Sequence, residues 1–93
     1  MKNWGVLSMR KVIFEGDALP QFMYWIHHNI KIVDKIYSLL ENIDRNGPSK
    51  GLGKPERLKH FDGWSRHITD EHRLVYSVTK DAIHIIACKG HYE

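Results

Sequence analysis

The sequence contains a single cysteine, Cys88, among its 93 residues. An internal disulfide is therefore excluded, and one free thiol is typical of a protein in a reducing compartment, so we expect a cytoplasmic location. Long hydrophobic runs are also lacking, because none approaches the roughly 20 apolar residues that cross a membrane. Residues 1–8 include no apolar stretch of the length found in secretory signals. These absences argue against the membrane and exported classes of protein.

Acidic residues are outnumbered by basic ones over residues 50–73, where only Glu56, Asp62, Asp70 and Glu71 offset the positive charges. The whole chain has 14 Lys and Arg against 11 Asp and Glu, a formal net charge of +3. The positive charges cluster over residues 50–73, at Lys50, Lys54, Arg57, Lys59, Arg66 and Arg73. Trp64 and Tyr76 are interleaved with them, and basic groups beside aromatic rings can bind phosphates and stack bases. A solvated sheet face gives the same composition, so composition only suggests nucleic acid.

The spacing of apolar residues predicts one strand and two helices in the first half. Lys11–Phe14 has the short apolar character of a buried strand. Asp17 can cap a helix that has Pro20 in its first turn. A break near His28-Asn29 precedes a second helix, from Ile30 to about Arg45. The expected apolar faces are Phe22, Met23, Trp25 and Ile26 on the first helix and Val33, Ile36, Leu40 and Ile43 on the second.

Four short strands are predicted after the helices, because apolar segments alternate with turn signals. They are Glu56 to about His60, Trp64–Ile68, His72–Val78 and Ala82–Cys88. Short connections imply antiparallel pairing. We therefore expect a single α+β domain, with two N-terminal helices packed on one face of an antiparallel sheet.

Alternation along the third of these strands predicts which side chains share a face. Leu74, Tyr76 and Val78 point one way, and we assign them to the helix-packed core. Arg73 then projects from the open face, where its guanidinium can hold a phosphate bidentately. Glu56 opens the first strand of the meander, and the terminal His91 could fold back across the same face.

A carboxylate, a histidine, an arginine and a lysine on a cationic face could form a metal-free ribonuclease site. A base removes the proton from an RNA 2′-hydroxyl, cations stabilise the phosphate, and an acid protonates the departing 5′-oxygen. Charged residues on an exposed sheet need no function, so spacing alone leaves this as one option. We expect no metal and no cofactor, since His27-His28 face different directions on a helix, Glu71-His72 lacks a second histidine, and Cys88 has no partner cysteine.

Three sequence blocks, GKPERLKH, WSRHITDEHRLVY and IIACKGHY, occur in this order. Together they resemble the YoeB-type messenger-RNA-cleaving toxins of the RelE superfamily, and the resemblance runs from about Met9 to Tyr92. It implies a RelE-like, microbial-ribonuclease-like fold and cleavage of messenger RNA in the ribosomal A site. It also implies inhibition by a YefM/Phd-type antitoxin and, often, a homodimer. Residues 1–8 lie outside the resemblance, so we expect an N-terminal extension or alternative start there and one toxin domain over residues 9–93.

The resemblance further implies roles for individual residues. Glu56 falls on the family's general base, Arg73 on the arginine that stabilises the phosphate, and His91 on the general acid. Tyr92 falls on the terminal tyrosine that helps to position the substrate. The expected contacts to RNA and ribosome are Lys50, Lys54, Lys59, Arg66, His67 and Lys89.

Some residues depart from the family pattern. His67 replaces an arginine, Lys89 replaces another, and Gly90 replaces a bulky residue, so the local positive charge falls at neutral pH. Glu93 adds a carboxylate after the usual terminal tyrosine. A RelE-like module with weakened catalysis, acting mainly as an antitoxin partner or co-repressor, therefore stays open as an alternative. The enzyme is favoured because an inert module has less reason to retain the whole set of Glu56, Lys59, Arg73, His91 and Tyr92.

Overall fold

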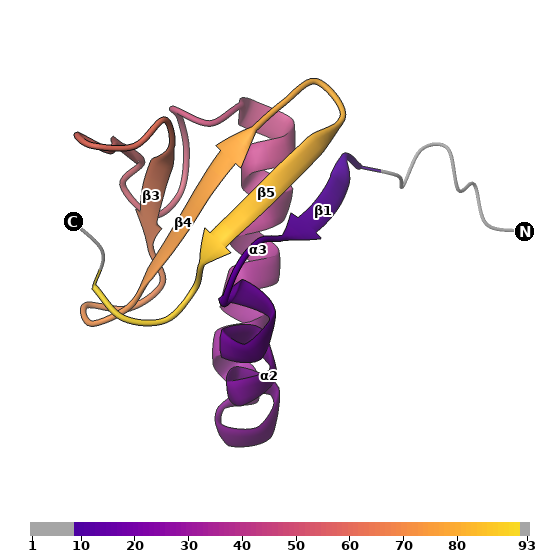
Figure 1. The fold of residues 1–93 in the computed structure, drawn as a ribbon, viewed down its shortest axis with the longest axis vertical. Helices are drawn as coiled ribbons and strands as arrows, with labels where there is room; N and C mark the ends of the chain where they lie inside the picture. The colour runs from indigo at the N-terminus through magenta and orange to yellow at the C-terminus, as the bar shows by residue number, and fades with distance from the viewer. Residues whose placement is uncertain (1–8, 92–93) are drawn as a thin grey trace, which may run out of the picture.

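The computed structural model describes residues 9–91 (Figure 1). Its elements are β1 (Lys11–Phe14), α2 (Ala18–His28), α3 (Ile30–Asn46), β2 (Glu56–Arg57), β3 (Trp64–His67), β4 (Arg73–Val78) and β5 (Ala82–Ala87). The predicted order of a strand, two helices and a meander is confirmed, and so is the α+β class. The expectations for residues 1–8 and for Tyr92 and Glu93 lie outside the described residues.

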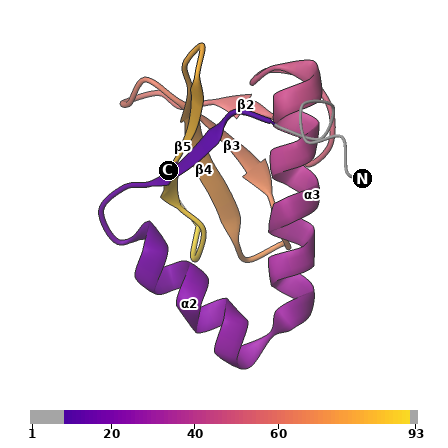
Figure 2. The same cartoon turned by 90° about the vertical axis from the view of Figure 1, so that its right-hand side faces the viewer.

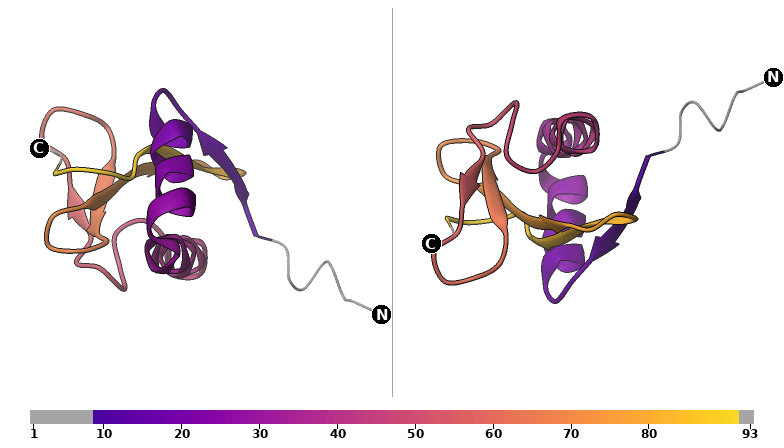
Figure 3. Two further views of the ribbon diagram at one scale, coloured as in Figure 1. Left: turned by 90° about the horizontal axis from the view of Figure 1, so that it is seen from below. Right: turned by 90° about the horizontal axis from the view of Figure 1, so that it is seen from above.

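The strands form one sheet in the order β1-β5-β4-β3-β2. The meander from β2 to β5 is antiparallel, as predicted, whereas β1 pairs in parallel with β5. The first and last strands are therefore neighbours, and the two helices form the connection that separates β1 from the meander. The views in Figure 3 show β1 on one side of the molecule and β3 on the other.

The two helices meet in a V, and α3 runs alongside the sheet (Figure 2). The bend is at Asn29, whose φ of −160° and ψ of 88° are extended, so the helical path is broken there. Asp17 occupies the N-cap position of α2, but its side chain makes no capping hydrogen bond. Within residues 9–91, no helix is long and apolar enough to cross a membrane.

The core lies between the helices and one face of the sheet. On α3 the predicted stripe is confirmed by Ile36, Leu40 and Ile43, which are all buried. On α2 the prediction was half wrong, because Trp25 is buried whereas Met23 and Ile26 are 42% and 39% exposed. Apolar residues occur on all sides of α2, so the sequence did not determine which side of the helix faces the core.

The predicted alternation on β4 is confirmed. Leu74 and Tyr76 are fully buried in the core, and Val78 packs against it. Arg73 lies on the opposite face and lines a pocket there. A register shift between Val75 and Tyr76 marks a bulge in the pairing of β4 with β5. The strand predicted to run from Glu56 to His60 ends earlier, at Arg57.

Candidate active site

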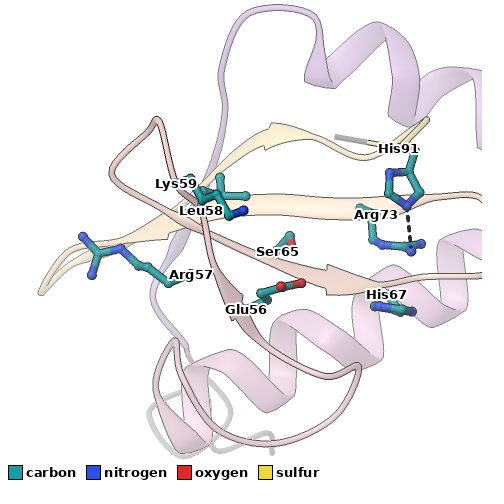
Figure 4. A pocket seen from close by; sticks show the side chains of 8 residues that line it. All are labelled: Glu56, Arg57, Leu58, Lys59, Ser65, His67, Arg73 and His91. Carbon is teal, nitrogen blue, oxygen red and sulfur yellow. Dashed lines mark hydrogen bonds between the residues drawn. The ribbon is translucent and has the colours of Figure 1, made fainter. Parts of the chain in front are cut away.

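An open pocket lies over β2, β3 and the start of β4 (Figure 4). Its lining is Glu56, Arg57, Leu58, Lys59, Ser65, His67, Arg73 and His91. Its volume is about 180 Å³, smaller than the roughly 300–1,000 Å³ of sites that enclose a small ligand. The pocket therefore suits one short part of a longer molecule, such as a phosphate with its neighbouring groups.

Three segments far apart in sequence supply the predicted acid, base and cation. Glu56 opens β2 and is held there by pairing with Ser65 of β3. Arg73 begins β4, and His91 follows β5. Figure 4 shows the three side chains on the same pocket, with the Glu56 carboxylate directed into it.

Arg73 is fixed by the turn that precedes its strand. Its Nη1 atom donates to the carbonyl oxygens of Thr69 and Asp70, each at 2.9 Å. Its Nη2 atom lies 3.0 Å from Nε2 of His91. One side of the guanidinium is thus anchored by backbone and the other faces the histidine, so the guanidinium is held in one orientation at the pocket.

The C-terminal segment that carries His91 is anchored at several points. Backbone N–H of Arg73 donates to the Gly90 oxygen at 2.9 Å, and Gly90 N–H donates to Nδ1 of His72 at 2.8 Å. The Trp25 indole donates to the Cys88 oxygen at 2.8 Å. Gly90 has a φ of +91°, a conformation that glycine adopts more readily than other residues.

Sequence reasoning missed this anchoring role of Trp25 and His72. His72 lies in the second of the three sequence blocks, but nothing in the sequence shows that the Trp25 indole, on α2, reaches the segment that carries His91. The available signal was indirect. A buried tryptophan usually finds a partner for its N–H group, and the tail supplies it.

His67 lines the pocket where the family pattern has an arginine. Its pKa is lowered from 6.5 by burial and then by the positive charges of Arg73 and Lys54, against smaller opposing effects of Asp70 and Glu56. At neutral pH the imidazole is therefore largely uncharged. This agrees with the loss of positive charge expected where a histidine replaces the arginine of the family pattern.

The other lysines predicted to contact RNA or ribosome lie either in the pocket or outside it. Lys59 lines the pocket. Lys50 and Lys54 are exposed on the loop before β2. Lys89 is also exposed, and its Nζ lies 4.8 Å from the centre of the Tyr24 ring. These three lysines lie outside the pocket lining and can serve only a wider surface.

The prediction that Arg66 contacts RNA is wrong. Arg66 is fully buried, and its guanidinium forms hydrogen bonds within the protein. The reason is strand alternation: Ser65 and His67 line the pocket, so Arg66 between them points to the helices.

Cys88 is fully buried, as expected of a small hydrophobic side chain. Burial raises the pKa of its thiol to about 11. It is therefore protonated at neutral pH and unsuited to nucleophilic chemistry. Over residues 9–91, no three His, Cys, Asp or Glu side chains are grouped so that they could hold a metal ion.

Comparison with known proteins decides the family. The profile described as "YoeB-like toxin of bacterial type II toxin-antitoxin system" matches residues 14–92, most of the chain. The chain belongs to the YoeB family. The family resemblance predicted from the three sequence blocks is confirmed. The protein named Toxin YoeB of Escherichia coli strain K12 is 46% identical over 84 residues, which cover 88% of this chain and 99% of that relative.

Solved structures of YoeB proteins share this fold. A structure described as the YoeB dimer from Staphylococcus aureus has a TM-score of 0.86 and 42% identity, covering 91% of this chain and 100% of that one. The toxin in a heterotetrameric YoeB-YefM complex from the same species has a TM-score of 0.84 with 42% identity and the same coverage. The core and pocket described above thus belong to a YoeB-family toxin.

Proposed function

We propose that this chain is an endoribonuclease toxin that cleaves messenger RNA in the ribosomal A site. One observation carries the proposal: Glu56, Arg73 and His91, which come from three separate segments, line one open pocket. The pocket faces solvent and does not enclose a ligand, so a strand presented by the ribosome can reach it.

The proposed reaction is attack of an RNA 2′-hydroxyl on the neighbouring phosphate. Glu56 takes the proton from the 2′-oxygen, which forms a bond to phosphorus while the bond to the 5′-oxygen breaks. Arg73 and Lys59 stabilise the negative charge of the crowded phosphate, and His91 protonates the departing oxygen. The products are a 2′,3′-cyclic phosphate and a free 5′-hydroxyl. Each proton transfer of this kind is worth roughly 100- to 10,000-fold in rate.

We propose that this reaction is independent of a metal ion. The support is that side chains already supply the required charges: Arg73 and Lys59 take the place that a metal would have beside the phosphate. Tyr92 is proposed to help position the substrate, as the resemblance implies, and Lys50, Lys54 and Lys89 to contact RNA or ribosome at the periphery. We likewise propose that the toxin acts in the cytoplasm.

For partners, we propose a YefM/Phd-type antitoxin and a homodimer. The related Staphylococcus aureus proteins described as a YoeB-YefM complex and a YoeB dimer support both. An acidic antitoxin segment that folds on binding would complement the exposed basic residues around the pocket.

The test is to add the purified chain to ribosomes translating a defined message and to map the ends of the cleaved RNA. Cleavage should persist in a metal chelator and stop on addition of the antitoxin. A message with a single 2′-deoxy nucleotide at the cut site should resist. Equal cleavage of the deoxy and ribose messages would overturn the acid and base roles. Antitoxin binding without any cleavage would favour the alternative of a catalytically weakened module.

A further inference from the structure

The buried Arg66 sits at the centre of a hydrogen-bond cluster beneath the sheet. Its Nε atom donates to the Tyr76 hydroxyl at 2.8 Å. The four other contacts are Nη1 to Asn42 Oδ1 at 2.7 Å and to Leu52 O at 2.9 Å, and Nη2 to Gly47 O at 3.0 Å and to Lys50 O at 2.7 Å. A guanidinium has five N–H donors, so all of them are used.

Most of these acceptors belong to one loop, residues 47–54, which joins α3 to β2. The Tyr76 hydroxyl adds a further contact, since it accepts from Arg66 and donates to the Pro48 oxygen at 2.6 Å. The carbonyl oxygens of four loop residues are therefore held by two side chains of the sheet. We call this arrangement the Arg66–Tyr76 clamp.

Two glycines let the loop lie directly against the clamp. A Cβ added to Gly51 would come within 1.8 Å of Asn42 Oδ1, and one added to Gly53 would come within 3.0 Å of the Arg66 Cβ. Their φ angles of +116° and +83° are also conformations that other residues rarely adopt. A side chain at either glycine would therefore force the loop away from the clamp.

The clamped loop leads directly into the proposed general base. The Gly53 oxygen accepts from the His67 N–H at 2.7 Å, and the chain then passes Lys54 and Pro55 to reach Glu56. β2 has only two residues, so its own pairing with β3 is short. The position of Glu56 consequently depends on how the preceding loop is held.

We propose that Arg66 and Tyr76 are positioning residues that hold Glu56 over the pocket through the loop 47–54. Neither side chain touches the reacting groups. The consequence for cleavage rests on the ribonuclease function proposed above. A buried cation is costly to desolvate, and apolar residues often stabilise a core equally well. The four directed hydrogen bonds from Arg66 and Tyr76 to one loop supply geometry that an apolar side chain cannot.

The experiment compares Tyr76→Phe and Arg66→Lys with two matched controls at exposed positions of α3, Tyr37→Phe and Arg45→Lys. Tyr76→Phe keeps the buried ring and removes only the bridging hydroxyl. Arg66→Lys keeps the charge but has three donors in place of five. Circular dichroism and antitoxin binding first establish that each variant is folded.

We expect both clamp variants to lower kcat with little change in KM, since they displace a catalytic group and leave the basic surface intact. A displacement of about 1 Å can cost on the order of 100-fold. The same substitutions are then made with Glu56→Gln. If the clamp acts through Glu56, its effect on kcat should largely vanish in that background. Equal effects in both backgrounds, or clamp variants as active as the controls, would overturn the proposal.

Hydrogen exchange separates this proposal from the proposed function. The Leu52 N–H donates to Asn42 Oδ1 at 2.9 Å, so its exchange reports on the loop. Both clamp variants should accelerate exchange at Leu52 and in β2, whereas the controls should not. If the unaltered chain fails to cleave RNA, the proposed function fails, and exchange alone decides the clamp. Unchanged exchange in Tyr76→Phe and Arg66→Lys would refute it.

Discussion

The Nη2 atom of Arg73 lies 3.0 Å from Nε2 of His91. A guanidinium can only donate hydrogen bonds, so the histidine nitrogen accepts and carries no proton at Nε2 in this arrangement. Phosphate oxygens accept strongly from arginine. A phosphate bound by Arg73 would therefore replace His91 as the acceptor and free Nε2 to carry the proton that an acid needs.

Arg73→Lys should reduce cleavage severely while leaving antitoxin binding measurable. Lysine keeps the charge but cannot donate from two nitrogens, one to backbone and one toward the phosphate. We expect a loss on the order of 100- to 1,000-fold, the size seen when one stabilising donor is removed. Single-turnover cleavage on programmed ribosomes measures it. The control is Arg45→Lys, and equal rates for both variants would contradict the role given to Arg73.

Trp25→Phe should weaken the anchoring of the C-terminal segment. The substitution removes the indole N–H that donates to the Cys88 oxygen and keeps an aromatic ring in the core. We expect a loss of about 1 kcal/mol in the free energy of unfolding, typical of one hydrogen bond. Cleavage should fall as well, because His91 follows three residues later. Chemical denaturation and cleavage assays measure the two effects, and a destabilised variant with full activity would show that this anchor does not serve the site.

His67→Arg should strengthen binding to ribosomes at neutral pH. The lowered pKa leaves His67 largely uncharged there, whereas arginine adds a permanent positive charge in the pocket. For single-stranded RNA, one additional phosphate contact should steepen the dependence of log K on log salt by about 0.7. Sedimentation at several salt concentrations tests this. His67→Gln is the control and should match the unaltered chain at pH 8, so a similar gain in both variants would rule out the charge as the cause.

His67 should also make the fold less stable in mild acid. Its folded-state pKa is lowered, so the unfolded chain binds more protons as the pH falls through about 6.5, the ordinary value of histidine. The contribution of His67 to the free energy of unfolding is therefore fully present above that pH and is lost as the pH falls below it. The side chain is partly exposed, so the effect should be small. His67→Gln should flatten this part of the curve in urea denaturation between pH 5 and about 8, and parallel curves would contradict the assignment.

Charge reversal of the exposed lysines should weaken binding of the antitoxin. Lys50→Glu combined with Lys54→Glu removes positive charge beside the pocket without disturbing buried groups. If an acidic segment binds there, the complex should lose affinity and most of its salt dependence. Isothermal titration at two salt concentrations measures both. Lys35→Glu, on the exposed side of α3, is the matched control, and an affinity unaffected by the double reversal would place the antitoxin elsewhere.

The sequence predicted most of the elements and several of the residues that line the pocket, for physical reasons. Apolar spacing marked α3 clearly because one stripe of a 3.6-residue period must face the core. Alternation on β4 placed Arg73 on the open face because successive side chains of a strand point to opposite sides. The order of the strands placed Glu56 and His91 near that face as one option, and their roles as base and acid came from the family resemblance.

Other features needed the three-dimensional structure. The parallel pairing of β1 with β5 joins segments about as far apart as the chain allows, and no local signal encodes it. The burial of Arg66 could have been predicted from alternation, since Arg66 shares a strand face with Trp64, which packs against the core. Its positive charge suggested RNA instead. The five acceptors that satisfy it lie on α3, β4 and the loop, and no spacing rule brings them together.

The place of β5 in the sheet determines when a newly synthesised chain can form its pocket. β5 lies between β1 and β4, so the first strand to be synthesised has no neighbour until the last has been made. The proposed acid, His91, follows β5 in the chain. A nascent chain whose β5 is still inside the ribosome cannot complete the sheet or the pocket. Assembly of the pocket therefore waits until β5 has emerged, which gives an antitoxin time to bind the chain first.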